Sequence, residues 1–504
     1  MILQMTPFRR FFTLIAIALL ATSAIAAKTA PNILFIFADD QAYDTLGPND
    51  DPLVQTPHLD RLASQGTQFT QCFNMGSWSG AVCVASRAML NTGKTVWHAH
   101  AIQQSLGSLK SKSESEKGRF YDRYWSRRMS RLGYETYFTG KWHVSVDANK
   151  LFDHVVHIRP GMPGDSRNNK NSNVGYNRPV EGQTDDWDPT DPKFGGFWEG
   201  GKHWSEVLAD DAVTYLQAEG KKKATQTDAK PFFMYLAFNA PHDPRQSPQE
   251  FLDLYPLENI KTPIPFQPKY PHLTSGLNPN LRDEALGVYP RTEYAVRVHR
   301  REYYSLITHM DAQIGRIIAE LDKQGLRENT WIIFTADHGL ACGHHGLLGK
   351  QNMYDHSIRT PFIIVGPEAK PGETIDRPIF LQDLMATSLE LAGDKERKGI
   401  EFQSLLPDLR GEVQDAAPVY SAYLETQRAI RHDGWKLILY PKLKVKRLYN
   451  YASDPKEIND LAADSGQLGR MKTLFKLLQK EQARFDDKVD LVAVYPELAH
   501  ELEL

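Results

Sequence analysis

Runs of apolar residues without polar alternation recur along the chain and predict strands that are buried on both faces. Residues 31–38, 231–238 and 331–336 are of this kind, which is typical of the inner strands of a largely parallel sheet. A long helical pattern over 303–324 ends at Gly325. The patterns predict an α/β fold, in which helices sandwich a large mixed, mostly parallel sheet.

The pattern changes after the last of these strands. Residues 428–450 contain short alternating segments around a turn at 432–434, which predicts antiparallel hairpin strands, and a helix is expected over about 467–485. We therefore predict a large domain over 27–415 and a smaller C-terminal α+β subdomain, an antiparallel sheet plus helix, over 416–504.

The first 26 residues have the pattern of a secretory signal peptide. Arg9 and Arg10 precede an apolar run over 11–21, and small residues at positions 24 and 26 suit a cleavage site. The apolar run is short for a membrane span, and no cysteine marks a lipid-anchored form. We expect an exported protein, periplasmic or secreted, without a membrane anchor.

Composition and charge narrow the classes of function. The chain has 504 residues, 41% of them hydrophobic, and a formal net charge of -3. This near-neutral balance argues against nucleic-acid binding, which needs a basic surface. The three cysteines, Cys72, Cys83 and Cys342, leave at least one thiol unpaired.

The segment Cys83-Val84-Ala85-Ser86-Arg87 is the strongest candidate for chemistry. It follows a run of small residues over 76–82 and enters a short helix that Gly93 ends. A side chain at the start of a helix faces free N–H groups and the positive end of the dipole, which suits a nucleophile that handles an anion. The alternatives are a buried structural thiol and a Cys72–Cys83 disulfide.

Acidic residues directly follow two of the predicted strands. Asp39 and Asp40 come after the first, and Asp337 and His338 come after the strand over 331–336. Ligands collect beyond the carboxyl ends of such strands, and a cation would offset the repulsion of adjacent carboxylates. This favours a Ca²⁺ or Mg²⁺ site; the alternative is a solvated turn.

Basic residues follow two further strands. Lys141 and His143 come after a strand expected over 134–139 and a turn at Gly140, and would project the same way if the chain stayed extended. Such a pair can bind an anionic oxygen and move a proton. His242 follows the strand over 231–238, and Arg245 is close enough in sequence to bind a carboxylate or hydroxyl of a ligand.

Together these motifs resemble the sulfatase family of the alkaline-phosphatase superfamily, over nearly the whole mature chain. Residues 83–87 fit Cys-x-Ala-x-Arg, with Ala85 where Pro is commoner. Residues 133–143 fit Gly-Tyr-x-Thr…Gly-Lys-x-His, and residues 241–244 fit Pro-His-x-Pro. The resemblance implies an alkaline-phosphatase-like fold, makes residues 27–415 the catalytic domain, and makes the nucleophile a formylglycine that a maturation enzyme produces from Cys83.

The resemblance also implies the roles of the other residues. Expected catalytic residues are Cys83, Arg87, Lys141, His143, His242 and Lys350, of which Lys141, His242 and Lys350 also bind the substrate. Arg245 is a further substrate-binding candidate from its place in the sequence alone. Expected ligands of the cation (Ca²⁺, with Mg²⁺ possible) are Asp39, Asp40, the modified Cys83, Asp337 and His338. His338 departs from the more usual amide or carboxylate oxygen.

The expected reaction is hydrolysis of sulfate esters on a sulfated polysaccharide of the ulvan, carrageenan or glycosaminoglycan type. Export favours a carbohydrate, and so does an irregular, aromatic-containing insert over 144–202. Three alternatives stay open: an arylsulfatase, a phospho- or phosphonate-monoester hydrolase, and an inactive glycan-binding homologue.

Overall fold

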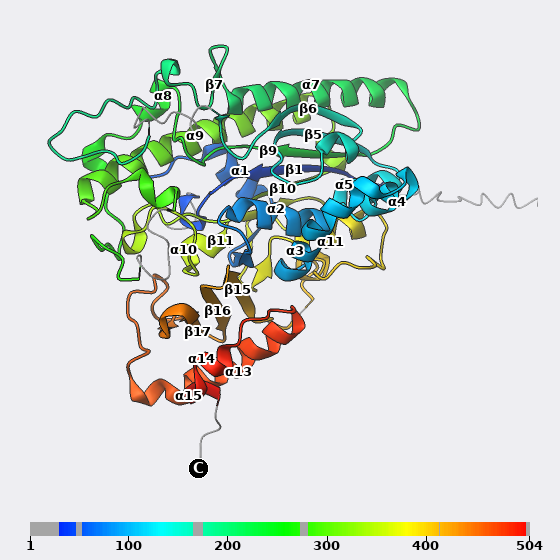
Figure 1. Ribbon diagram of the computed structural model, residues 1–504. Coiled ribbons are helices and arrows are strands. Elements are labelled where there is room, and N and C mark those ends of the chain that lie inside the picture. The colour runs from blue at the N-terminus through cyan, green and yellow to red at the C-terminus, as the bar shows by residue number, and fades with distance from the viewer. Residues whose placement is uncertain (1–29, 47–52, 165–174, 273–280, 413, 500–504) are drawn as a thin grey trace, which may run out of the picture. The chain divides into compact units, whose positions relative to one another are not determined.

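The computed structural model describes residues 30–46, 53–164, 175–272, 281–412 and 414–499. Its central strands are β1 (Asn32–Ala38), β2 (Thr67–Phe69), β5 (Glu135–Lys141), β6 (His154–Arg159), β9 (Phe232–Ala237), β10 (Thr330–Ala336), β12 (Phe362–Val365) and β13 (Glu373–Ile375). Within the described residues they form an eight-stranded sheet in the order β13-β2-β12-β10-β1-β9-β5-β6. Figure 1 labels five of these strands, β1, β5, β6, β9 and β10. The strands from β10 to β6 are parallel, while β12 runs antiparallel to both its neighbours. The mixed, mostly parallel sheet is confirmed.

The central strand β1 is buried at every position. Its odd-numbered apolar residues pack into one hydrophobic cluster and its even-numbered ones into another, because successive side chains point to opposite faces of a sheet. Helices α1 (Pro57–Gln65), α7 (Trp204–Thr225) and α9 (Glu293–Lys323) cover one face, and α2 (Val82–Thr92), α5 (Trp125–Arg131) and α11 (Asp383–Leu391) contribute to the other. Because helices cover both faces of the sheet, these strands are apolar on both faces and show no alternation of apolar and polar residues.

A second sheet holds the C-terminal strands. Among the described residues its order is β18 (Val445–Asn450), β17 (Trp435–Tyr440), β16 (Gln427–His432), β15 (Val419–Tyr423) and β4 (Gly76–Ser77). The first four are antiparallel and α13 (Leu468–Arg484) packs on them, as predicted. The fifth, β4, comes from the segment just before Cys83 and pairs parallel with β15, so this sheet also supports the start of α2.

The remaining elements are short or peripheral. They are β3 (Cys72–Phe73), β7 (Trp198–Glu199), β8 (Lys202–His203), β11 (Arg359–Thr360), β14 (Ile379–Phe380), α3 (Val96–Ser105), α4 (Glu114–Tyr121), α8 (Gln249–Leu252), α10 (Asp355–Ile358), α12 (Leu406–Leu409), α14 (Leu491–Val494) and α15 (Pro496–Ala499). No helix in the described part of the chain is long and apolar enough to cross a membrane. The predicted signal peptide lies outside the described residues, and the boundary after residue 415 stays a prediction.

Two strands of the central sheet differ from the sequence-based expectation. The predicted turn at Gly140 is wrong, because β5 continues to Lys141. Gly140 has a φ of 101° and breaks the register of β5 with β6, so it bends the strand without ending it. The second difference is β6 itself, which adds an edge strand within the insert that was expected to be irregular.

Gly140 generates a prediction about stability. A Cβ at this position would lie 1.9 Å from the carbonyl oxygen of Ala237 on β9. A Cβ at Gly133, which also has a positive φ, would meet nothing within 4 Å. We expect Gly140→Ala to lower the free energy of unfolding by more than about 3 kcal/mol, and Gly133→Ala by about 1 kcal/mol from backbone strain alone.

Urea unfolding of the two variants and the wild type measures this difference. Equal losses in the two variants would mean that β5 moves away from β9 freely, and that Gly140 is required only for its backbone conformation.

Candidate active site

The site begins at Cys83, the second residue of α2. Gly93 ends this helix with a φ of 63°, and its N–H donates to the carbonyl of Met89, as the sequence predicted. Cys83 is only 2% exposed. The start of α2 therefore holds the sulfur inside the protein, next to the residues that follow β1 and β10.

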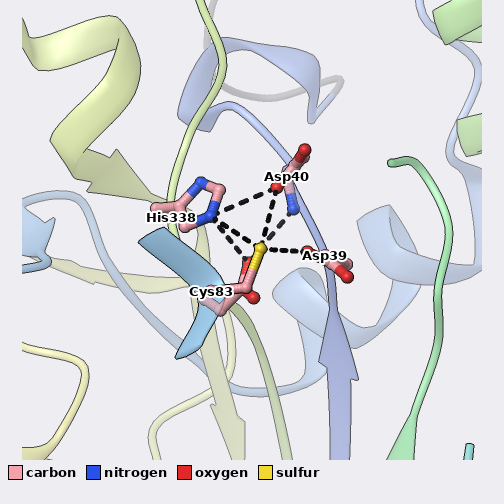
Figure 2. Close-up of side chains that lie close together, drawn as sticks. Asp39, Asp40, Cys83 and His338 are labelled. Atoms are coloured by element: carbon pink, nitrogen blue, oxygen red, sulfur yellow. Dashed lines mark hydrogen bonds and ion pairs between the residues drawn. The ribbon is translucent and has the colours of Figure 1, made fainter. Parts of the chain in front are cut away.

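The sulfur of Cys83 lies at the centre of a group of charged side chains, part of which Figure 2 shows. It is 3.3 Å from Asp39 Oδ1, 4.0 Å from Asp40 Oδ1, 3.5 Å from His338 Nε2, 3.4 Å from Lys350 Nζ and 3.7 Å from Lys141 Nζ. Asp39 and Asp40 follow β1, His338 follows β10, Lys141 is the last residue of β5, and Lys350 precedes α10. The fold thus brings together the residues that the strand-end argument and the resemblance selected.

The acidic part of this group has the donors of a cation site. One ligand atom from each of Asp39, Asp40, Cys83, Asp337 and His338 lies within 4.8 Å of all the others, and all five residues are buried. The Nδ1 of His338 is 2.9 Å from the Gly339 carbonyl, so Nδ1–H donates there and the Nε2 lone pair faces the carboxylates. That orientation suits a metal-ligating histidine, and the carboxylate oxygens suit Ca²⁺ or Mg²⁺. The residues therefore fit a divalent cation.

Three basic side chains balance the three carboxylates. Arg87 Nε is 3.1 Å from Asp337, Lys350 Nζ is 2.6 Å from Asp40, and Lys141 forms an ion pair with Asp39. Burial raises the pKa of Asp40. Burial also tends to raise the pKa of Asp337. The positive charges of His338, Arg87 and Lys141 outweigh it and hold the pKa of that carboxyl below its usual range. Each of the three carboxylates therefore has a basic partner within the buried group.

Burial also affects the thiol. It raises the pKa of Cys83 well above its usual value, although Lys350 acts in the opposite direction. A raised pKa disfavours the thiolate, which is the nucleophilic form of a cysteine side chain. The chain's cysteines are all free, and Cys72 lies in β3. The Cys72–Cys83 disulfide is contradicted.

Two histidines adjoin the group. His242 Nε2 is 3.7 Å from Asp40 Oδ2, and its Nδ1 is 2.6 Å from the Asp243 carbonyl. Burial, followed by Lys350 and Lys141, lowers the pKa of His242 well below its usual value. Burial and then Lys141 also lower the pKa of His143, to about 2. His143 has a φ of 51°, so the extended backbone that was expected to align it with Lys141 is not present.

The structure separates Arg245 from this group. Arg245 is 4% exposed, its guanidinium lies 5.6 Å from the Tyr303 ring centroid, and it is 3.5 Å from the His299 carbonyl. None of its contacts within the described residues reaches the carboxylates or lysines around Cys83. A role in ligand binding therefore has no support from its position.

Arg282 is a site residue that the sequence did not reveal. Its Nη2 is 3.4 Å from His242 Nε2, and it pairs with Asp243 and Asp283. The side chain of Arg282 is 32% exposed, whereas those of Lys141 and Lys350 are 0% and 2% exposed. No motif marks Arg282, because it reaches His242 from a distant segment. Of these three cations, Arg282 has the most exposed side chain.

Comparison with known proteins identifies the family. The sulfatase family model matches residues 31–394, and a model described as "N-sulphoglucosamine sulphohydrolase, C-terminal" matches residues 343–484. The chain belongs to the sulfatase family. As a sulfatase it is a hydrolase of sulfuric esters, which confirms the expectation drawn from Cys83, Lys141 and His242.

The relatives are distant but cover nearly the full chain. A sulfatase of Formosa agariphila is 26% identical over 499 residues, 95% of this chain and 93% of the relative. An ulvan-active sulfatase of the same organism is 29% identical over 90% of this chain and 80% of the relative. A solved phosphonate monoester hydrolase from Silicibacter pomeroyi superposes with a TM-score of 0.70 at 21% identity, covering 92% of this chain and 97% of that chain. This last likeness shows the shared fold alone.

The carboxylates around Cys83 generate a prediction about metal binding. We expect Ca²⁺ to raise the Tm of the metal-free protein, because an ion that binds only the folded state stabilises that state. At a hundredfold excess over Kd, the free energy of unfolding should rise by about 2.7 kcal/mol. Asp337→Ala should abolish this rise. The control is Asp311→Asn, which changes a buried carboxyl that accepts N–H groups of α1.

Thermal unfolding with and without Ca²⁺, together with calorimetric titration, measures the effect for both variants. An undiminished Ca²⁺ response in Asp337→Ala would place the cation elsewhere.

Proposed function

We propose that this sulfatase removes sulfate from a sulfated carbohydrate, with a formylglycine made from Cys83 as nucleophile and a divalent cation, Ca²⁺ or Mg²⁺, beside it. One observation carries the proposal: the side chain at position 83 lies within 4.0 Å of two carboxylates, a histidine and two lysines. Such a position suits a group that attacks an anionic ester, since the lysines neutralise the anion and the carboxylates hold a cation.

The burial of Cys83 supports conversion of the residue before the chain folds. A side chain that is 2% exposed is inaccessible to another enzyme in the folded protein. We therefore infer that the maturation enzyme acts on the unfolded segment around Cys-x-Ala-x-Arg. A hydrated formylglycine supplies one hydroxyl that attacks sulfur and a second whose deprotonation expels sulfate, which the thiol lacks.

The surrounding residues then have separate tasks. Arg87 holds the nucleophile and Asp337 in place, and Lys141 and Lys350 neutralise the sulfate oxygens in the transition state. His242 donates a proton to the leaving alcohol. Its low pKa in the free protein is expected to rise when the sulfate anion binds beside it. His143 accepts the proton whose removal releases sulfate.

Asp39, Asp40, Asp337 and His338 hold the cation, together with the modified side chain at position 83. When bound, the ion supplies positive charge that favours the reactive form of the nucleophile.

The carbohydrate class of the substrate has two supports. One relative is an ulvan-active sulfatase, and the predicted signal peptide over 1–26 implies export to a place where polysaccharides are found. Arg282 provides a partly exposed cation at the edge of the site. We propose that Arg282, in place of Arg245, binds a carboxylate or hydroxyl of the sugar that carries the sulfate.

The alternatives differ in their chemistry. A phosphate or phosphonate ester would use the same cations, and a fold neighbour is a phosphonate monoester hydrolase. Comparing kcat/KM for a sulfate ester and a phosphate ester of the same leaving group separates sulfatase from phosphoesterase activity. Comparing kcat/KM for an aryl sulfate and a sulfated oligosaccharide tests the arylsulfatase alternative. The full set of charged residues around Cys83 disfavours an inactive glycan-binding homologue.

The proposed nucleophile is tested by mass spectrometry. The peptide that contains residue 83, from protein expressed with a maturation enzyme, should be about 18 Da lighter than its cysteine form. Cys83→Ala should abolish hydrolysis of a sulfate ester. Cys72→Ala removes another buried thiol, in β3, and should retain activity. Activity of Cys83→Ala within tenfold of wild type would exclude the assignment.

The two arginines are tested as a pair. We expect Arg282→Gln to reduce kcat/KM on a sulfated oligosaccharide by at least about tenfold, because a charge-assisted hydrogen bond is lost. Its kcat/KM on a small aryl sulfate should change little. Arg245→Gln should lower the Tm while leaving kcat/KM per folded enzyme near wild type. The reverse outcome would return the substrate-binding role to Arg245.

A further inference from the structure

A second cavity, separate from the active site, is lined by more basic than acidic side chains. It has a volume of about 470 Å³ and lies where the C-terminal end of α2 meets α4, α5 and the loop after α11. Of the described residues that line it, six are basic and two are acidic: Lys94, Arg119, Arg123, Arg128, Arg131 and Lys398 against Asp122 and Asp394. No residue assigned to the active site is among them.

Ion pairs neutralise only half of this positive charge. Asp122 pairs with Arg131, and Asp394 lies 3.8 Å from Arg128. Lys94 pairs with Glu401 at 2.7 Å. The remaining cations, Arg119, Arg123 and Lys398, are exposed, and no carboxylate in the described part of the chain forms an ion pair with them. The cavity therefore has a surplus of positive charge in a chain whose net charge is -3.

Several of these cations are held in place before any ligand arrives. Arg123 Nε is 3.0 Å from the Phe120 carbonyl, and its guanidinium lies 4.2 Å from the centroid of that ring. Arg128 Nη2 donates to the Lys398 carbonyl at 2.7 Å, which connects the end of α5 with the loop after α11. Ordered guanidinium groups lose less conformational entropy when an anion binds.

The cavity and the active site lie at opposite ends of one helix. Cys83 is near the start of α2, and Thr92, its last residue, lines the cavity. At 1.5 Å per residue, these positions are about 14 Å apart along the helix axis. An anion in the cavity therefore does not contact the reacting group. It binds at a site of its own.

We propose that this cavity is a second glycan-binding site, which holds sulfate groups of a polyanionic chain away from the reacting ester. The choice of ligand rests on the proposed function, because it takes the partner to be the same class of sulfated glycan. A volume of 470 Å³ is within the usual range of ligand pockets. The cations come from three segments, which suits several anionic groups on one chain better than a single small anion.

Binding of dextran sulfate to the folded protein tests the proposal, with unsulfated dextran and sodium sulfate as comparison ligands. The test variant is Arg119→Gln/Arg123→Gln/Lys398→Gln. The control is Lys221→Gln/Lys476→Gln/Lys480→Gln, which removes three exposed cations from α7 and α13. Calorimetric titration at low and high salt gives the affinities.

We expect wild type and control to bind dextran sulfate equally, with an affinity that falls as salt rises. The cavity variant should bind at least about fivefold more weakly. Equal affinity in all three proteins, or equal weakening in both variants, would overturn the proposal. If sodium sulfate displaced dextran sulfate at a matched concentration of sulfate groups, a single small anion would bind as well as the chain. That result would overturn the claim that the cavity prefers a polyanionic chain.

Hydrolysis of a small sulfate ester, measured on the same preparations, tests the proposed function separately. Both triple variants should keep wild-type kcat/KM, since none of the six residues contacts the active site. Absence of hydrolysis in all three proteins would refute the proposed function, while the dextran sulfate affinities would still decide the fate of the cavity.

Discussion

The balance of buried charges at the end of β1 is the constraint on which the site depends. Asp39, Asp40 and Asp337 are withdrawn from water, and each has a basic partner among Arg87, Lys141 and Lys350. A buried charge without its partner costs about 3–5 kcal/mol. The strands and α2 must therefore be placed accurately, because every pair joins side chains from different elements.

This balance connects stability with chemistry. Inner strands such as β1, β9 and β10 are held by apolar contacts on both faces, and their carboxyl ends position the charged residues. Two glycines help to place the elements that carry these residues. Gly140 allows β5 to pass close to β9, and Gly93 ends α2. The group at position 83 thus meets preorganised charges, which lowers the reorganisation needed when charge shifts in the transition state.

The fold leaves the choice of ester open. A phosphonate monoester hydrolase shares it at a TM-score of 0.70, and sites rather than folds carry function. Two further features lie outside the buried group. Arg282 is partly exposed beside His242, and a basic cavity lies at the far end of α2. We propose that a charged carbohydrate contacts the protein at both places, away from the bond that is broken.

The sequence by itself determined the inner strands β1, β9 and β10, the residues that follow them and the likeness to sulfatases. These features are local: an apolar run with no alternation indicates a strand, and polar residues directly after it gather at the same edge of the sheet. Only the tertiary structure decided the rest. Arg282 reaches Asp243 across 39 residues of chain, and Arg245, though adjacent to a motif, is buried against Tyr303. The basic cavity combines three segments, and Gly140 continues a strand because β9 lies beside it. Such contacts depend on how distant segments pack, and no short pattern encodes them.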